Sequence, residues 1–322
     1  MGAIWNALPA LEGFFTIGVL IGVGWVLARF GVLTVEHRKM MSLLALYVAS
    51  PALMFVTMVN ADLKRVFAWS VIGSYGAIVG VALIYILATI IFFHRHTLAE
   101  RTIGTLLSCY SNAGNLGIPV AAYALGDVTW VVPILLIQMV LLQPIGLGIL
   151  DWSKARDSGK RPSALALVTL PVRNPLTVGV LLGLIVNLVH TSAPSFAIPG
   201  FVMNPVQMLG NVAVPMMLLA FGISMCLDPK PVRGSETVES WFVIVIKTLI
   251  QPLIAYTLSA WVLHLDPVAV RAVTVVACLP PAQNIFVFAS KYDVRMVFAR
   301  DTIFWATLVS VVTILIAATL LA

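Results

Sequence analysis

Long apolar stretches, separated by short polar segments, occupy most of the chain. A transmembrane helix needs about 20 apolar residues, whereas a transmembrane strand needs about 10 with strict alternation of apolar and polar positions. The stretches in this chain are long and do not alternate, so they predict an all-α membrane protein. We expect ten transmembrane helices, at residues 9–28, 40–59, 67–93, 102–125, 129–150, 175–190, 201–225, 241–263, 268–289 and 296–321.

The fourth and ninth of these stretches are interrupted near the middle. The fourth contains Ser111–Pro119, with two asparagines, two glycines and a proline, and the ninth contains Leu279–Asn284, with two prolines, a glutamine and an asparagine. Lipid cannot hydrogen-bond an unwound backbone, so a break at this depth is tolerated only where protein or a water-filled cavity supplies the partners. Two broken helices in corresponding parts of two halves are typical of the binding site of a secondary transporter.

The apolar stretches fall into two sets of five. A polar segment at residues 151–174 separates them, so we expect a first repeat at residues 1–150, a cytoplasmic linker, and a second repeat at residues 175–322. The motif TIGVLIG at residues 16–22 is similar to TVGVLLG at residues 177–183. An odd number of helices per half gives the halves opposite orientations in the membrane, so the pattern predicts an inverted repeat.

Composition and charge agree with a membrane protein, since 61% of the residues are hydrophobic and 10% are charged. The excess of Lys and Arg over Asp and Glu, 19 against 13, requires no nucleic-acid partner, because the basic residues fall mostly in short loops. Fifteen of them lie on one side of the predicted membrane and three on the other. The positive-inside rule therefore places both termini on the non-cytoplasmic side of the cytoplasmic membrane. The three cysteines lack metal-ligand spacing, and we expect no metal and no cofactor.

The two interruptions supply the candidate substrate site. The half-helix that follows a break begins with unpaired N–H groups and a partial positive charge, which favours an anion. Polar side chains in mid-membrane either face a cavity or bond to neighbouring helices. The predicted substrate-binding residues are Asn112, Gly114, Asn115, Pro281, Gln283 and Asn284, and the predicted crossover or hinge positions are Gly117, Pro119 and Pro280.

Three further polar residues inside predicted spans are candidate cavity-lining residues. Lys247 is either a counter-charge for an anionic substrate or a side chain that extends to the nearby interface. Gln138 and Gln143 either line the same cavity or hydrogen-bond to neighbouring helices. None of the 13 acidic residues lies at the expected centre of a span, where a cation site would normally need one.

The same motifs resemble those of a known family. NAGNLGIP at residues 112–119, PAQNIFVFA at residues 281–289 with Tyr292, and Lys247 ahead of Pro252 look like the auxin efflux carrier family. This family includes plant PIN transporters and bacterial malate and malonate permeases, and the resemblance covers essentially the whole chain. It implies two inverted five-helix repeats, in which the first, second, sixth and seventh helices form a scaffold and the others form a moving transport domain.

The resemblance also implies how the site works. The fourth and ninth helices would cross at the site, transport would use an elevator-like alternating access, and Asn112 matches the asparagine that contacts the substrate carboxylate in plant relatives. A homodimer is suggested as well. Ile285 stands where the plant proteins have a crossover proline, and the short linker lacks the long plant regulatory loop, so both favour a bacterial-type small organic acid over auxin.

The predicted function is therefore a secondary active transporter of a small organic anion, a mono- or dicarboxylate, embedded in the lipid bilayer. A sodium-coupled organic anion symporter of the bile acid symporter type and a passive channel are alternatives, because broken helices also bind Na⁺ or line pores. An intramembrane enzyme is not expected, since the sequence has no HExxH motif, no paired mid-membrane aspartates and no serine–base pairing.

Overall fold

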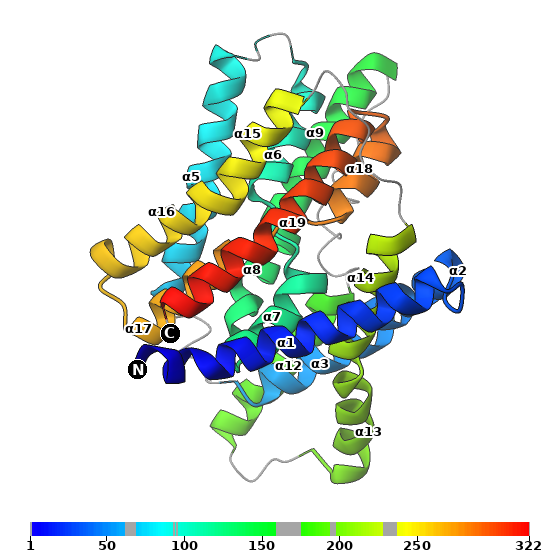
Figure 1. The fold of residues 1–322 in the computed structure, drawn as a ribbon, viewed down its shortest axis with the longest axis vertical. Coiled ribbons are helices and arrows are strands. Elements are labelled where there is room, and N and C mark those ends of the chain that lie inside the picture. Colours follow the sequence, from blue (N-terminus) through cyan, green and yellow to red (C-terminus); the bar gives the residue numbers. More distant parts are fainter. Residues whose placement is uncertain are drawn as a thin grey trace.

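The structure is a computed structural model, and it describes residues 2–61, 69–92, 94, 96–158, 175–193, 198–227 and 237–321. Within these residues the regular structure is helical, with one isolated β-bridge (Figure 1). The helices are α1 (Gly2–Arg29), α2 (Val35–Leu44), α3 (Ser50–Val59), α5 (Ser70–Ile91), α6 (Leu98–Cys109), α7 (Ile118–Ala124), α8 (Val132–Ile137), α9 (Gln143–Ser158), α12 (Pro175–Ser192), α13 (Gly200–Asn211), α14 (Ala213–Leu227), α15 (Thr237–Val245), α16 (Gln251–Thr257), α17 (Pro267–Ala277), α18 (Asn284–Tyr292) and α19 (Met296–Leu320). Short helical turns join several of them: η1 (Ala45–Ala49), η2 (Ala113–Gly117), η3 (Val128–Val131), η4 (Gln138–Leu142), η5 (Ile246–Ile250) and η6 (Leu258–Val262).

Seven of the expected stretches form uninterrupted helical segments that are long and apolar enough to cross a membrane. They are Val35–Val59, Ser70–Ile91, Val128–Lys154, Pro175–Ser192, Gly200–Leu227, Val238–Val262 and Met296–Leu320. The first expected stretch is the helix α1, which is apolar over Phe15–Arg29, and the remaining two are the predicted broken helices. An all-helical, multi-pass membrane protein is thus confirmed, whereas the inverted repeat of ten helices stays a prediction.

Two long helix pairs pack closely through glycine. The helix α1 lies against α14, and α12 lies against α3. A Cβ atom added at Gly24 would overlap the backbone of Leu219, and one added at Gly183 would overlap that of Phe55. Small residues let helix backbones approach in this way, which strengthens packing where lipid provides no hydrophobic drive. Gly18 and Gly22, by contrast, have open space beside them, so the glycines of the TIGVLIG motif do not form the close contact.

A π-helical turn precedes the proline in four helical segments. The turns η1, η2, η4 and η5 end two residues before Pro51, Pro119, Pro144 and Pro252. Proline lacks an N–H group and its ring crowds the carbonyl one turn earlier, and a wider turn relieves this crowding. These helices therefore continue through their prolines without breaking at them.

Side-chain caps fix where the broken helices begin. Thr97 precedes α6 and accepts a hydrogen bond from the Glu100 N–H, while the Glu100 carboxylate accepts from the Thr97 N–H at 2.7 Å. Asp266 precedes α17 and accepts from the Ala269 N–H at 3.0 Å, with Pro267 at the first helical position. Both arrangements satisfy N–H groups that a helix start leaves without partners.

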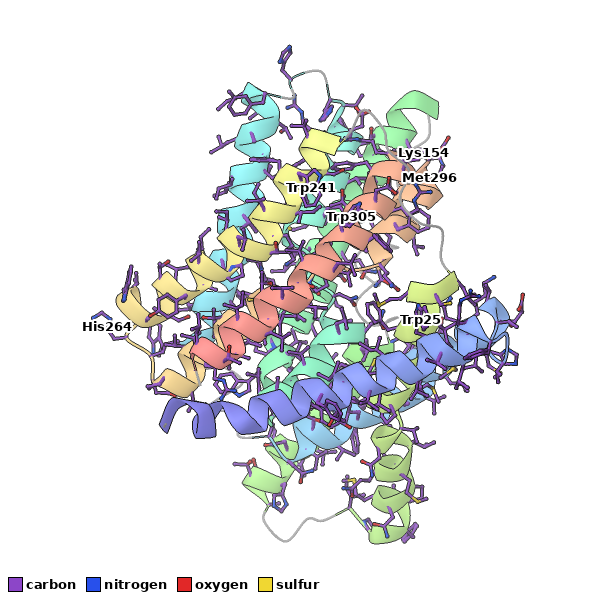
Figure 2. All side chains as sticks on the ribbon, viewed as in Figure 1. Trp25, Lys154, Trp241, His264, Met296 and Trp305 are labelled. Carbon is purple, nitrogen blue, oxygen red and sulfur yellow. The ribbon has the colours of Figure 1, made fainter. Side chains whose placement is uncertain are left out.

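The outer surface is apolar and carries large aromatic side chains. Trp25, Trp241 and Trp305 all lie at the surface, and the rings of the last two are 6.1 Å apart (Figure 2). Exposed apolar side chains also extend along α5 and α12. Contiguous apolar surface of this extent is unusual for a monomer in water and is expected where lipid is the solvent.

Some boundaries differ from the expected ones. The helix α9 continues to Ser158, into the predicted linker at residues 151–174, and residues 159–174 lie outside the described part of the chain. The helix α2 begins at Val35 instead of residue 40, because Thr34 and His37 form a capping box there. The helix α15 begins at Thr237 and so includes Glu239, which lies outside the expected stretch at residues 241–263.

Candidate functional site

The two broken helices meet at their breaks. The chain between α6 and η2 pairs with the chain between α17 and α18 through an antiparallel bridge of Ser111 and Pro281. The Asn112 N–H donates to the Pro280 carbonyl at 2.7 Å, and the Ala282 N–H donates to the Tyr110 carbonyl at 3.0 Å. Each unwound segment thus supplies hydrogen-bond partners that lipid cannot offer to the other. We call these two paired segments, residues 110–112 and 280–282, the crossing.

Lys247 fastens a third helical segment to the crossing. Its side chain is fully buried, and its ammonium donates to the Ser111 hydroxyl and to the Gln251 amide oxygen, each at 2.6 Å. Of the two alternatives for Lys247, extension to the interface does not hold, because the ammonium ends on the crossing. The basic amino group of Lys247 therefore lies beside the break, in addition to the partial charges of the half-helix ends.

Asn112 caps the half-helix that follows the first break. Its amide oxygen accepts a hydrogen bond from the Asn115 N–H at 3.3 Å. The NH₂ group of the same amide takes no part in this cap. That NH₂ group is buried, with the residue 3% exposed, and it has no hydrogen-bond partner within the described residues. Buried polar groups are nearly always paired, so an orphaned donor at this position is typical of a ligand site.

Two adjoining cavities lie next to the crossing. The smaller has a volume of about 40 Å³ and contains both Asn115 and Gln283 in its wall, one from each broken helix. The larger has a volume of about 700 Å³ and is lined mainly by apolar side chains of α14, α18 and α19. Five residues line both cavities, namely Arg38, Ser42, Phe221, Ser224 and Gln283.

The other predicted substrate-binding residues, Asn112 included, are not among the residues that line either cavity. Gly114 is half-buried, and a Cβ atom added there would have only Leu176 within 4 Å, at 3.9 Å. Pro281 is buried in the bridge of the crossing. Asn284 is exposed at the start of α18 and is not among the residues that line either cavity.

The three predicted hinge positions have packing roles in this structure. Gly117 has ordinary helical dihedrals, with φ −64°, and a Cβ there would lie 2.8 Å from Val131 and 2.9 Å from Leu279. Its lack of a side chain therefore allows close packing instead of an unusual backbone conformation. Pro119 lies in the first turn of α7, where no intrahelical N–H is needed, and Pro280 accepts a crossing hydrogen bond.

Residues 9–318, nearly the whole chain, match the family described as membrane transport protein, the family of the auxin efflux carriers. The chain belongs to this family. It is 25% identical over 297 residues to a protein of Rhizobium meliloti named "Putative malonate transporter", covering 92% of this chain and 90% of the relative. It is also 25% identical to an uncharacterized transporter of Methanocaldococcus jannaschii (92% and 94% covered) and 24% identical to an uncharacterized transporter of Escherichia coli K12 (86% of each covered).

In this auxin efflux carrier family member, the two glutamines of the fifth predicted span have different surroundings. The Gln143 amide oxygen accepts from the Tyr110 hydroxyl at 3.2 Å, so it supports the crossing from one side. Gln138 is 1% exposed, and its NH₂ group has no hydrogen-bond partner within the described residues. Neither is among the residues that line the two cavities.

Several residues of the transporter's site escaped the sequence-based prediction. Ser111 lies inside the predicted motif, but only the structure shows that Lys247 donates to it. The spacing of Lys247 and Gln251, one helical turn apart, was a usable signal for their contact. Arg38 was counted only as a loop cation of the positive-inside pattern, although it lines both cavities.

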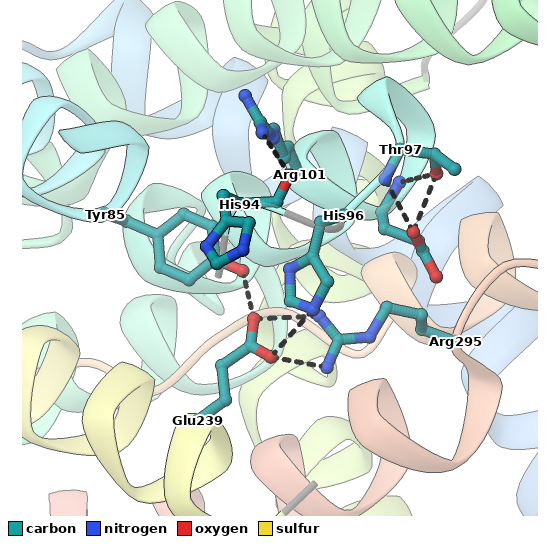
Figure 3. A network of polar contacts seen from close by, with 8 residues as sticks. Tyr85, His94, His96, Thr97, Arg101, Glu239 and Arg295 are labelled. Carbon is teal, nitrogen blue, oxygen red and sulfur yellow. Dashed lines mark hydrogen bonds and ion pairs between the residues drawn. The ribbon is translucent and has the colours of Figure 1, made fainter. Parts of the chain in front are cut away.

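A second buried polar cluster joins residues in or next to four helices of the transporter, away from the crossing (Figure 3). The Glu239 carboxylate accepts two hydrogen bonds from the Arg295 guanidinium, at 2.7 and 2.8 Å, and one from the Tyr85 hydroxyl at 2.5 Å. His96 lies 3.6 Å from the same carboxylate. Because these residues come from α5, the start of α6, α15 and the start of α19, the cluster ties those helices into one unit.

Replacing Tyr85 with Phe is expected to lower the free energy of unfolding by about 1.5–3 kcal/mol, because a buried carboxylate loses a donor. Tyr75→Phe on the same helix is the matched control, since the Tyr75 hydroxyl donates to the neutral Pro133 carbonyl at 2.9 Å. That change should cost only about 0.5–1.5 kcal/mol. Thermal unfolding of both variants in detergent compares the two losses of stability. Equal losses would show that the Tyr85 hydroxyl bond to Glu239 stabilises the protein no more than a bond to a neutral carbonyl.

Proposed function

We propose that the protein is a secondary active transporter that carries a small organic anion, a mono- or dicarboxylate, by alternating access. The observation that carries this proposal is the buried, unpartnered NH₂ group of Asn112 at the crossing. A carboxylate oxygen is a suitable acceptor for it, and the Asn115 and Gln283 amides line the adjoining cavity. Family membership supports transport as the activity.

The charges around the site favour an anion. The Lys247 ammonium lies on the crossing, and of the described residues that line the larger cavity three are basic and none is acidic: Arg38, Lys39 and Arg300. In addition, the half-helix that begins after Asn112 directs its N-terminal N–H groups and partial positive charge toward this region. No carboxylate is among the described residues that line either cavity, which favours the organic anion over a sodium site.

The arrangement of helices is consistent with an elevator-type movement. The reciprocal packing of α1 with α14 and of α12 with α3 supports a scaffold built from the first, second, sixth and seventh predicted helices. The crossing belongs to the other helices, which would form the transport domain. The walls of both cavities combine the two groups, with α2 and α14 on one side and the broken helices on the other.

The charge pattern of the loops indicates which side of the membrane the cavities face. Arg38 and Lys39 follow the loop after α1, and Arg300 follows the loop before α19. Both loops belong to the side with fifteen basic residues, which the positive-inside rule assigns to the cytoplasm. In this proposal the structure represents the inward-facing state, and both termini lie outside the cytoplasm.

Counterflow in proteoliposomes tests the function. The relative named as a malonate transporter makes malonate the first substrate to use. Vesicles loaded with unlabelled malonate should accumulate labelled malonate transiently, with saturation, and replacement of sodium by choline at fixed pH should leave the rate unchanged. Uptake that rises linearly without counterflow would indicate a channel, and dependence on sodium would favour the symporter alternative. Recovery of the label with an altered mass would instead indicate an enzyme.

A further inference from the structure

The half-helix α18 has one buried face and one face toward a cavity. Ile285, Ala289 and Tyr292 are buried and follow one another at intervals of about one turn, and α18 packs against α6, α9 and α19 (Figure 1). Phe286 and Gln283, the residue just before the helix, line the larger cavity instead. Contacts on the buried face therefore decide how α18 is rotated about its axis.

Two contacts fix the end of α18 that lies away from the crossing. Asp293 has a left-handed backbone, with φ 56°, and the Val294 N–H donates to the Ala289 carbonyl at 2.9 Å, which closes the helix. The hydroxyl of Tyr292, the last residue of α18, donates to the carboxylate of Asp151 on α9 at 2.6 Å. This second contact joins α18 to another helix, and we call it the α9 tie.

The α9 tie is strong for a single side-chain contact. A hydroxyl bonded to a carboxylate is shorter and about twice as strong as a hydrogen bond between neutral groups. Lys154, about one turn further along α9 than Asp151, places its ammonium 5.8 Å from the centre of the Tyr292 ring, within the range of a cation–π contact. Two residues of α9 thus hold the same tyrosine.

We propose that Tyr292 and Asp151 are positioning residues for the substrate site, because the α9 tie sets the rotation of α18 and with it the place of Gln283. This inference rests on the proposed function, in which Gln283 lines the cavity beside the crossing. Nine residues of helix separate Gln283 from Tyr292 by about 13 Å along the axis. The α9 tie therefore acts on the substrate through the helix and not by contact.

A small rotation of α18 is enough to misplace Gln283. The Cα atoms of a helix lie roughly 2.3 Å from its axis, so a rotation of about 20° moves each of them by roughly 0.8 Å, and the end of a long side chain by more. A misplacement of about 1 Å can weaken a positioned interaction by up to a hundredfold. The crossing still holds the chain just before α18, through the Ala282 N–H, so we expect a partial loss.

The half-helix after the first break is held in another way, and this supplies a matched control. The helix α7 ends at Ala124, whose carbonyl accepts a hydrogen bond from the Arg271 guanidinium at 3.3 Å. Tyr123 lies near the end of α7, as Tyr292 lies at the end of α18. Its hydroxyl makes no hydrogen bond within the part of the chain that the structure describes. Tyr123→Phe is therefore the same chemical change without a tie to lose.

Malonate affinities of purified, folded variants, measured by calorimetry, test the inference. Tyr292→Phe and Asp151→Ala each remove one partner of the α9 tie, and each should weaken binding about 3- to 10-fold, as expected for a displacement of less than 1 Å. Asp151→Asn keeps an acceptor oxygen for the Tyr292 hydroxyl and should recover most of the affinity. Tyr123→Phe should bind like the wild type. A tie that serves stability alone would lower the unfolding temperature and leave these affinities unchanged.

A double variant shows whether the α9 tie acts through Gln283. Adding Tyr292→Phe to Gln283→Ala should cause little further loss of affinity, whereas independent effects would add in full. Wild-type affinity in Tyr292→Phe or in Gln283→Ala, full additivity, or an equal loss in Tyr123→Phe overturns the positioning role while the proposed function stands. Asp151→Ala decides the matter if Tyr292→Phe does not fold. Wild-type protein that binds no malonate overturns the proposed substrate, and this inference with it.

Discussion

Lys247→Met is expected to lower malonate transport at limiting substrate about a hundredfold while leaving the fold intact. The ammonium of Lys247 donates to Ser111 at the crossing, one residue from the unpartnered amide of Asn112. At a separation of roughly 5 Å and an effective dielectric constant of about 20, such a charge attracts a carboxylate by about 3 kcal/mol, which corresponds to about a hundredfold in affinity. The partial charges of the half-helix ends remain in the variant, so the loss should not be complete.

The fold should survive this change because two effects oppose each other. Methionine is apolar and similar in length, and replacement of a buried charge by an apolar side chain of similar volume is often neutral or stabilising. Against this, the Ser111 hydroxyl and the Gln251 amide lose their partner, which costs about 1–3 kcal/mol for each group left unsatisfied. We therefore expect a small net shift in the unfolding temperature, measurable in detergent.

Thr248→Val is the matched control for Lys247. Thr248 is also buried, but its hydroxyl donates only within its own helix, to the Ile244 carbonyl at 2.8 Å. This variant should transport malonate at close to the wild-type rate. Normal transport by a folded Lys247→Met variant would mean that the ammonium serves packing alone and that the site needs no formal charge.

Asn112→Asp is expected to weaken malonate binding about 10- to 100-fold, the range for a lost hydrogen bond to a charged group. Aspartate keeps the oxygen that caps the half-helix, because Asp and Asn are about equally good at a helix start, but it removes the NH₂ donor. It also brings a carboxylate to the place where the substrate carboxylate binds. Calorimetry on the purified variant measures the loss.

Two companion variants separate binding from folding. Asn112→Ala should lose the substrate contact as well as the cap, so it should bind malonate weakly and also unfold more readily, by about 1 kcal/mol. Asn60→Asp makes the same chemical change at an exposed asparagine, whose amide donates to the Val56 carbonyl within its own helix, and should bind like the wild type. Wild-type affinity in Asn112→Asp would falsify the assignment of the orphaned amide to the substrate.

The breaks were the part of this fold that the sequence predicted best. Asparagine, glycine and proline in the middle of an apolar stretch disfavour a helix, and both interruptions are present where those residues occur. The meeting of the two breaks was predicted as well. The register of the crossing was not, because which N–H faces which carbonyl depends on the packing of α6 and α17 and leaves no local signal.

Burial of charge was the main source of error. Glu239 lies inside α15 although the expected span begins at residue 241, whereas Arg295 precedes α19 as expected, and the two form a buried ion pair. The sequence has no local pattern that predicts this pair, because Glu239 and Arg295 are distant in sequence. Arg38 was likewise absorbed into the count of loop cations. Asn284 and Asn115 are both exposed, but only Asn115 is among the residues that line the smaller cavity, so the contact of Asn284 with substrate stays a prediction.

The central claim is that a carboxylate binds at the crossing of the two broken helices. A cryo-electron microscopy map of the protein with saturating malonate tests this most directly. We predict ligand density within hydrogen-bonding distance of the Asn112 NH₂ group, extending into the cavity of about 40 Å³ that Asn115 and Gln283 line. Density for malonate at another place, with the Asn112 amide still unpartnered, would contradict the account.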